Sequence, residues 1–513
     1  MLIQTKPEPV LRAGRIAAAG LVLAGLLAFA SSFADTGAQP PGRSAPVAAQ
    51  PQPPSQQSVL ADWLAEPRIN QADVGLIALP LSAGPPLIEH RSGSALNPAS
   101  TIKLLTSHAA LSMLGADYRW QTGAFLDGEL RGQALHGNLV LKGGGDPKLG
   151  IEDLVQFVAQ MRAAGLRELR GDLLIDDSIY DVGTASVDAF DDDRNQPYNV
   201  RPFGLLMNFK ATRVVVQPAA GRPRITLDPA LDGVVIENRL RVRGGRCQPG
   251  RDILSVTEAR APKTPSDRPG RIATARLLVS GTYTPACGEF GAFVSVLSHR
   301  EFIDALFRAV WREAGGLWDG TTRIARGAAQ GSPWLLWQSP RSLADVVHDI
   351  NKFSNNVMSR QLLLQLGHVS GAQPSTLSAG REALRGWMAR EGLSLPGLVL
   401  DNGSGLSRST RISAAGMAQV LLHAAKSGHG DLLRESLPVL GIDGTMRFRM
   451  AGEPLAGRAW IKTGSLADVS TIAGYLDAVS GTRYAVVLFV NGPRPSGARR
   501  LQEEFLRWVY RHG

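Results

Sequence analysis

The sequence predicts a multi-domain α/β protein in which a long β-rich segment interrupts a domain of mixed helices and strands. The chain has 513 residues, more than one hydrophobic core normally organises. Hydrophobic residues make up 44% and charged residues 19%, a balance typical of globular proteins. Residues 185–294 are rich in Gly, Pro and short β-like runs, whereas segments of helical period lie on both sides of them.

The periodicity of apolar residues predicts the elements in order. The expected strands before the β-rich segment are 73–81, 85–93, 119–142 and 168–178, and the expected helices are 59–64, 101–115 and 150–166. After it, helical character is expected to dominate 301–316, 342–367 and 380–392, followed by strands at 460–464, 470–478 and 484–492 and a helix at 498–512. Ser100 or Thr101 lies where the helix at 101–115 begins, a position that capping residues favour.

The N-terminus has the pattern of a secretory signal peptide. Two arginines precede an apolar run of 14 residues, Ile16–Phe29, and the small residues Ser32 and Ala34 follow it. A bilayer-spanning helix needs about 20 apolar residues, so a retained anchor is the weaker alternative. We expect residues 1–34 to be removed after Ala34 and the protein to be exported, with the periplasm as its compartment.

Composition also divides the rest of the chain. Residues 35–57 are rich in Pro, Gln, Ala and Ser and predict a disordered linker. Residues 58–125 and 295–513 are expected to form one domain, interrupted by an inserted region at 126–294 of one or two subdomains. These boundaries are expectations to within several residues.

The two cysteines of the chain, Cys247 and Cys287, both lie in the inserted region and are 40 residues apart. An oxidising compartment favours a disulfide between them, and two unrelated buried thiols are the alternative. Neither has a histidine close by in the sequence, so no structural zinc site is expected. The net charge is +10, but no Arg/Lys run interleaves with aromatic residues, and nucleic acid is not an expected partner.

Ser100 and Lys103 are the first candidate pair of reactive groups. Residues three apart on a helix share a face, so the two side chains can touch. A helix N-terminus disfavours a protonated amine, and desolvation lowers the pKa of a lysine, so Lys103 can serve as the base for a Ser100 nucleophile. The pattern S-x-x-K is common by chance, and the alternative is a capping serine beside a solvated lysine.

Two later stretches favour the catalytic interpretation. The sequence SNN places Ser354 and Asn356 in a region of helical pattern, and KTGS places Lys462–Ser465 at the end of a predicted strand. The motifs S-x-x-K, S-x-N and K-T-G, in this order, form the active-site set of penicillin-recognising serine enzymes. Each motif alone is common, but the three together in these contexts are specific.

The chain therefore resembles the class C low-molecular-mass penicillin-binding proteins, the D-alanyl-D-alanine carboxypeptidase/endopeptidase family of the penicillin-binding protein 4 type. The 254 residues between Ser100 and Ser354 are more than a class A β-lactamase needs and suit a long insertion. The segments GGGDPKL, GDLLIDDS, DNGSGLSR and GIDGTM also resemble this family, which extends the resemblance over about residues 58–510. It implies a transpeptidase fold, an antiparallel sheet flanked by helices, with a β-rich insertion.

The resemblance implies roles for the motif residues. Ser100 would attack the carbonyl of the penultimate D-alanine to form an acyl-enzyme, and Lys103 would take its proton. Ser354 would relay that proton to the leaving D-alanine, and Asn356 would hold the substrate amide and Lys103.

The K-T-G strand and one arginine are implied to bind the substrate. Lys462, with the hydroxyls of Thr463 and Ser465, suits the terminal carboxylate, and the backbone N–H groups of Ser100 and Ser465 would form the oxyanion hole. Gly464 would let the strand approach the ligand closely. Arg408, which follows DNGSGLS, is a candidate for binding a diaminopimelate carboxylate, and a solvated arginine is its alternative.

The expected function is that of a serine D-Ala-D-Ala carboxypeptidase and/or D-Ala-diaminopimelate endopeptidase acting on peptidoglycan stem peptides. β-Lactam antibiotics would act as covalent inhibitors, no cofactor or metal is expected, and contact with a membrane or wall polymer would be weak. The alternatives are a non-catalytic peptidoglycan-binding scaffold and a slow serine β-lactamase. The intact motifs disfavour the scaffold, and the absence of an E-x-x-L-N segment disfavours a fast lactamase. G-x-S-x-G and H-E-x-x-H motifs are absent.

Overall fold

The computed structural model describes most of the chain after the N-terminal segment. The described residues are 56–513 without 66–68, 184–189, 192, 194, 249–252, 260–274 and 494–496. The predicted signal peptide and the predicted linker up to residue 55 therefore lie outside the described residues. Within the described part, no helix combines the length and apolar character that crossing a bilayer requires.

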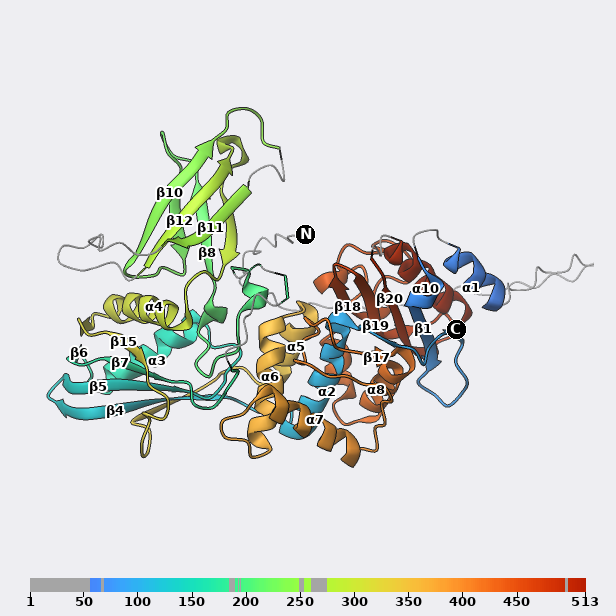
Figure 1. Cartoon of the computed structure of the whole chain (residues 1–513), viewed down its shortest axis with the longest axis horizontal. Helices are drawn as coiled ribbons and strands as arrows, with labels where there is room; N and C mark the ends of the chain where they lie inside the picture. The colour runs from blue at the N-terminus through green and yellow to red at the C-terminus, as the bar shows by residue number, and fades with distance from the viewer. Residues whose placement is uncertain are drawn as a thin grey trace, which may run out of the picture. The chain divides into compact units, whose positions relative to one another are not determined.

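A five-stranded antiparallel sheet joins the two ends of the described chain. Its strands, in spatial order, are β18 (Ala459–Leu466), β19 (Val469–Asp477), β20 (Arg483–Asn491), β1 (Val74–Pro80) and β2 (Ile88–His90). In the register of the central pair, Leu76 is opposite Leu488. The N-terminal strands therefore complete a sheet whose other strands come from the C-terminal end of the chain (Figure 1).

Helices cover both faces of this sheet. Since successive strand residues point to opposite faces, adjacent residues of one strand pack against different helices. Ile77 and Val487 pack in a buried cluster with helices α2 (Lys103–Leu114) and α8 (Ala414–Lys426). Their neighbours Leu76 and Leu488 pack in another cluster with helix α10 (Ala498–His512). Also on the described chain are α1 (Gln56–Leu64), α5 (Leu343–Lys352), α6 (Asn356–Val369), α7 (Leu377–Arg390), α9 (Gly430–Glu435) and the pair β3 (Ala95–Leu96) and β17 (Ile412–Ser413).

A second sheet, of seven strands, belongs to the inserted region. Its strands are β4 (Gln121–Arg131), β5 (Ala134–Gly143), β6 (Glu168–Leu169), β7 (Leu173–Asp176), β14 (Leu317–Trp318), β15 (Thr322–Ile324) and β16 (Leu335–Gln338). Helices α3 (Ile151–Ala163) and α4 (His299–Glu313) share its buried core. β4 begins before residue 126 and pairs with β16, which follows residue 294, so this sheet extends beyond residues 126–294 at both ends.

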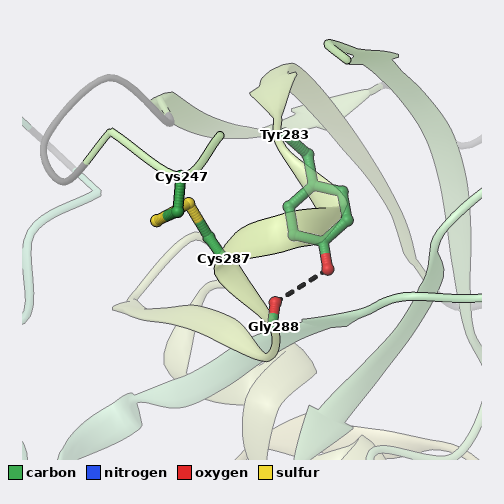
Figure 2. The surroundings of a disulfide bond; sticks show 4 residues. All are labelled: Cys247, Tyr283, Cys287 and Gly288. Carbon is green, nitrogen blue, oxygen red and sulfur yellow. Dashed lines mark hydrogen bonds between the residues drawn. A yellow bond between two sulfur atoms is a disulfide. The ribbon is translucent and has the colours of Figure 1, made fainter. Parts of the chain in front are cut away.

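The remaining strands form two three-stranded sheets. One contains β10 (Val234–Val242), β12 (Ala275–Tyr283) and β11 (Ile253–Ala259), and the other β13 (Phe290–Val294), β8 (Thr212–Gln217) and β9 (Arg224–Asp228). A disulfide joins Cys247 to Cys287, and beside it the Tyr283 hydroxyl donates a hydrogen bond to the Gly288 carbonyl (Figure 2). Closing a loop of this length stabilises a folded chain by about 4 kcal/mol in the chain-entropy model.

Candidate active site

The S-x-N motif lies at a break between two helices, within the stretch 342–367 for which the sequence predicted helical character. Helix α5 ends at Lys352 and α6 begins at Asn356. Ser354 has a φ of 61°, in the left-handed region that non-glycine residues rarely adopt. The Asn355 side chain caps α6 by accepting a hydrogen bond from the backbone N–H of Met358. The break thus places Ser354 just before the helix and Asn356 in its first turn.

The S-x-x-K motif lies on a short 3-10 turn that leads into α2. The turn spans Ala99–Ile102, and α2 begins at Lys103, so Ser100 precedes the helix and does not cap it. Strand residues fix this turn, because Thr471 Oγ1 donates to the Pro98 carbonyl over 2.8 Å. The segment just before it is held by reciprocal bonds between Asn97 and the Asn491 side chain, of 2.7 and 3.1 Å.

The Lys103 amine is the centre of the site. Nζ lies 2.9 Å from Ser100 Oγ, 2.7 Å from Asn356 Oδ1 and 2.5 Å from the Ser404 carbonyl oxygen. The last two atoms can only accept hydrogen bonds, so they take the two N–H donors of a neutral amine. The remaining lone pair of a neutral amine can then accept the hydroxyl proton of Ser100. Three separate segments of the chain thus converge on one nitrogen atom.

The environment of Lys103 favours the neutral amine. Its side chain is fully buried, and burial lowers the pKa of Lys103 well below its usual value. The positive charges of Lys462 and Arg360 lower the pKa further. The expected effect of the helix N-terminus acts in the same direction, but burial is the largest cause. A lysine in this setting has the protonation state that a general base requires.

A second lysine–serine pair is built from β18 and the helix break. Lys462 Nζ donates to Ser354 Oγ over 2.8 Å and to the Thr463 carbonyl over 2.8 Å. The Lys462 side chain is fully buried, and burial lowers the pKa of Lys462 to about 7. Near neutral pH this lysine is therefore partly protonated, so a bound anion would draw it toward the charged form.

The other K-T-G residues follow along β18. Thr463 Oγ1 lies 2.8 Å from Thr445 Oγ1, and either hydroxyl can be the donor. Gly464 packs against the 3-10 turn that carries Ser100. A Cβ added at Gly464 would lie 2.9 Å from the Ser100 backbone nitrogen and 2.8 Å from the Pro98 oxygen. Ser465 is exposed, and its hydroxyl makes no hydrogen bond to the residues that the structure describes. The small residue at 464 therefore lets strand and turn meet.

Arg408 lies apart from this hydrogen-bonded centre. Its Nη2 donates to the Phe190 carbonyl over 3.0 Å, and its guanidinium lies 5.1 Å from the centroid of the Phe190 ring. The side chain is exposed. The structure thus joins Arg408 to the inserted region, while Ser100, Lys103 and Asn356 meet directly and Ser354 meets Lys462.

Sequence reasoning assigned no role to four groups that complete this geometry: the Ser404 carbonyl and the side chains of Thr445, Thr471 and Asn491. Ser404 and Thr445 belong to DNGSGLSR and GIDGTM, which the sequence did single out. Thr471 and Asn491 lie on β19 and β20, and nothing in their local pattern distinguishes them from ordinary strand residues. Within the described residues, no group of His, Cys, Asp or Glu side chains is arranged to hold a metal ion.

Known proteins resemble the chain in both sequence and fold. A D-alanyl-D-alanine carboxypeptidase of Actinomadura sp. (strain R39) is 27% identical over 82% of this chain and 78% of its own length. The D-alanyl-D-alanine carboxypeptidase DacB of Haemophilus influenzae is 23% identical over 82% of this chain and 86% of its own. The crystal structure of penicillin-binding protein 4 (dacB) from H. influenzae has the same fold, with a TM-score of 0.72, 22% identity and coverage of 88% of this chain and 99% of that one.

The match to the family itself extends over nearly all of the described chain. The sequence profile of the D-Ala-D-Ala carboxypeptidase 3 (S13) family matches residues 56–511, which include Ser100, Ser354 and Lys462. This range spans the central sheet, its helices and the whole inserted region. With the motifs in their expected order and the fold shared, the chain belongs to the D-Ala-D-Ala carboxypeptidase 3 (S13) family.

Proposed function

We propose that the protein is a serine D-Ala-D-Ala carboxypeptidase that removes the terminal D-alanine from peptidoglycan stem peptides. The observation that carries this proposal is the buried Lys103 amine, with Ser100 Oγ beside it and two acceptor-only groups on its other sides. This arrangement gives the serine a base without a histidine. Family membership and the named activities of the relatives support the same reaction.

The reaction proceeds through two acyl transfers. Ser100 Oγ bonds to the carbonyl carbon of the penultimate D-alanine while Lys103 takes the hydroxyl proton. The bond to the terminal D-alanine nitrogen then breaks, and that nitrogen receives the proton through Ser354. Water next adds to the ester carbon while Lys103 takes one of its protons. The bond between that carbon and Ser100 Oγ breaks, Oγ receives the proton from Lys103, and the carboxylic acid product ionises to a carboxylate. Backbone N–H groups of Ser100 and Ser465 stabilise the oxyanion in both steps.

Substrate binding uses the other motif residues. Lys462 supplies the charge that holds the terminal carboxylate, with Thr463 and Ser465 offering hydroxyl donors. Arg408 remains a proposed binding partner for a diaminopimelate carboxylate. Its guanidinium is exposed, and it follows the segment that provides the Ser404 carbonyl. A β-lactam has an amide in the same position, so it acylates Ser100, in line with the H. influenzae structure complexed with a β-lactam.

Covalent labelling tests the acyl-enzyme. The full mature chain should take up a fluorescent penicillin, and Ser100→Ala should take up none. The exposed turn variant Ser480→Ala is a matched control and should label as the wild type does. If the wild type takes up no label, the acyl-enzyme mechanism is wrong. If instead the label is lost rapidly with repeated turnover of the penicillin, the protein is a β-lactamase.

Digestion of purified muropeptides separates the remaining activities. Release of one terminal D-alanine, followed by mass analysis, is the expected result for a carboxypeptidase. Conversion of cross-linked dimers to monomers would show an endopeptidase, with or without the first activity. A chain that binds muropeptides but releases nothing would support a wall-binding scaffold and overturn the proposed reaction.

A further inference from the structure

A cavity of about 590 Å³ lies at the ends of α2 and α6 that are remote from the catalytic groups. Tyr118, just after α2, and Gln365 and His368, in the last turns of α6, line one part of it. Strands of the seven-stranded sheet line the rest. Its volume is within the range of small-molecule sites, and none of the catalytic motif residues lines it.

One wall of the cavity is a face of the sheet where β4, β5 and β16 lie side by side. Gly123 on β4 is opposite Lys142 of β5 and opposite Leu336 of β16, so the three residues share this face. A Cβ at position 123 would lie 2.7 Å from the Phe125 ring. The glycine therefore lets that ring pack close to the strand, where it lines the cavity.

Cations, but no carboxylates, line this cavity. Lys142 is half-buried and makes no ion pair or hydrogen bond within the described part of the chain. Arg119 uses one nitrogen, Nη1, to donate to the carbonyls of Ser339 and Pro340, and its other N–H groups have no acceptor among the described residues. Asp146, whose charge reaches Tyr118, is itself 3% exposed and does not line the cavity.

Two acids lie near these cations but outside the lining. The charge of Asp345 reaches Arg119, and Asp176 is opposite Lys142 in the register, where its carboxylate accepts backbone hydrogen bonds from Ser178, Gly327 and Ala329. An anion entering the cavity would meet two cations and no carboxylate of the lining itself.

Polar groups able to bind amides are already fixed around these cations. Gln365 Nε2 donates to Tyr118 Oη over 2.9 Å, and Tyr180 Oη donates to Gln365 Oε1 over 2.6 Å. The Tyr118 hydroxyl hydrogen has no acceptor within the described residues and is free for a ligand. A peptide carbonyl that accepts this hydrogen would recover the free energy that an unpartnered hydroxyl costs.

We propose that this cavity is a second binding site for a short peptide with a free terminal carboxylate. The carboxylate pairs with Lys142 and Arg119, the cations of a lining that contains no carboxylate. A peptide carbonyl accepts the Tyr118 hydroxyl hydrogen, and small apolar side chains contact Phe125 and Leu336. The site does not depend on the proposed reaction, because no group of the catalytic centre takes part in it.

Calorimetric titration of the full mature chain, treated with penicillin to occupy the catalytic serine, tests this site. The probes are an acetylated alanine tripeptide with a free carboxylate, the same tripeptide as its terminal amide, and inorganic phosphate. We expect one free-acid tripeptide to bind per chain and the amide to bind at least tenfold more weakly. Lys142→Gln should weaken the free acid by a similar factor, whereas Lys426→Gln, an exposed lysine at the end of α8, should not.

Four results would overturn the proposal. They are no binding of the tripeptide, equal binding of acid and amide, unchanged binding by Lys142→Gln, and binding of phosphate but not of the tripeptide. The same titration on Ser100→Ala, without penicillin, separates this test from that of the reaction. If the Ser100→Ala variant still binds the tripeptide and the Lys142→Gln variant does not, the tripeptide binds in the cavity. This conclusion holds even if penicillin never acylates the protein.

Discussion

Lysines in opposite settings lie near the two ends of helices α2 and α6. Lys103 begins α2, whereas Lys142 belongs to β5 and lines the cavity beside the C-terminal ends. At the N-terminal ends, Lys103 is fully buried and its amine touches three oxygen atoms. At the C-terminal ends, Lys142 is half-buried in a cavity and contacts no acceptor within the described residues. These settings underlie the two proposed roles, a base for Lys103 and an anion-binding group for Lys142.

The difference shows that burial and hydrogen-bond acceptors determine the protonation state of a lysine amine and the chemistry it can take part in. Removing the amine from water favours its neutral form, and acceptor-only neighbours orient its lone pair toward Ser100. An amine that keeps access to water retains its charge and attracts a carboxylate. The four predictions below test this contrast.

Replacing Lys103 by arginine should have the largest effect. A guanidinium stays protonated and cannot accept the Ser100 proton, so we expect acylation by penicillin to slow by about 10²–10⁴-fold. The measurement is the rate of fluorescent penicillin labelling. Lys426→Arg, at an exposed position, should label at the wild-type rate. Labelling by Lys103→Arg within about threefold of wild type would exclude Lys103 as the base.

The pH dependence of kcat/KM for peptide hydrolysis should reveal the titration of the Lys462 amine. Because burial lowers the pKa of Lys462 to about 7, the charge that holds the substrate carboxylate is lost as the pH rises above neutrality. We expect kcat/KM to fall roughly tenfold per pH unit on the alkaline side. Lys462→Arg should remove this falling limb, since a guanidinium remains charged. The same alkaline limb in both proteins would assign the titration to another group.

Removing the partner of Thr463 should have a smaller effect. Thr445→Val keeps the shape of the side chain but deletes the hydroxyl 2.8 Å from Thr463 Oγ1. We expect KM for a D-Ala-D-Ala peptide to rise about fivefold with kcat little changed, because one neutral hydrogen bond contributes about 1 kcal/mol. Thr482→Val, at a half-buried position just before β20, serves as the control. An unchanged KM would show that Thr445 does not position Thr463.

Lys142→Arg, the counterpart of Lys103→Arg, should have the smallest effect. Arginine retains the positive charge, so binding of the free-acid tripeptide to the cavity should change by less than about threefold. Penicillin labelling of Lys142→Arg should match the wild type, because Lys142 is remote from Ser100. A large loss of tripeptide binding, as in Lys142→Gln, would mean that the cavity requires the shape of lysine as well as its charge.

Much of the fold was predictable because long periodic segments dominate the two ends of the chain. The expected strands at 470–478 and 484–492 correspond to β19 and β20, and the helix at 498–512 corresponds to α10. The helical character predicted over 342–367 is confirmed by α5 and α6, but periodicity does not reveal the break between them, where the backbone at Ser354 turns to a positive φ. Likewise, Ser100 was placed at the start of a helix, whereas a 3-10 turn intervenes.

The predicted site residues came from motifs rather than from geometry. The motifs named both lysines, but the Ser404 carbonyl beside Lys103 could not be predicted, since it is a backbone atom 301 residues away. Gly464 was expected to approach the ligand, and the structure adds a close approach to the Ser100 backbone. The cavity could not be predicted from the sequence, because its lining residues come from strands and helices that are far apart in the chain and have ordinary local patterns.

The pairing of β1 with β20 has a consequence for how the protein is made. Leu76 of β1 and Leu488 of β20 are opposite each other in the five-stranded sheet. This sheet therefore cannot form until the C-terminal strands have been synthesised. The seven-stranded sheet draws its strands from residues 121–338 alone and can form earlier. We therefore expect the inserted region to fold first as the chain emerges. The catalytic centre should then assemble late and slowly, because its contacts are so far apart in sequence.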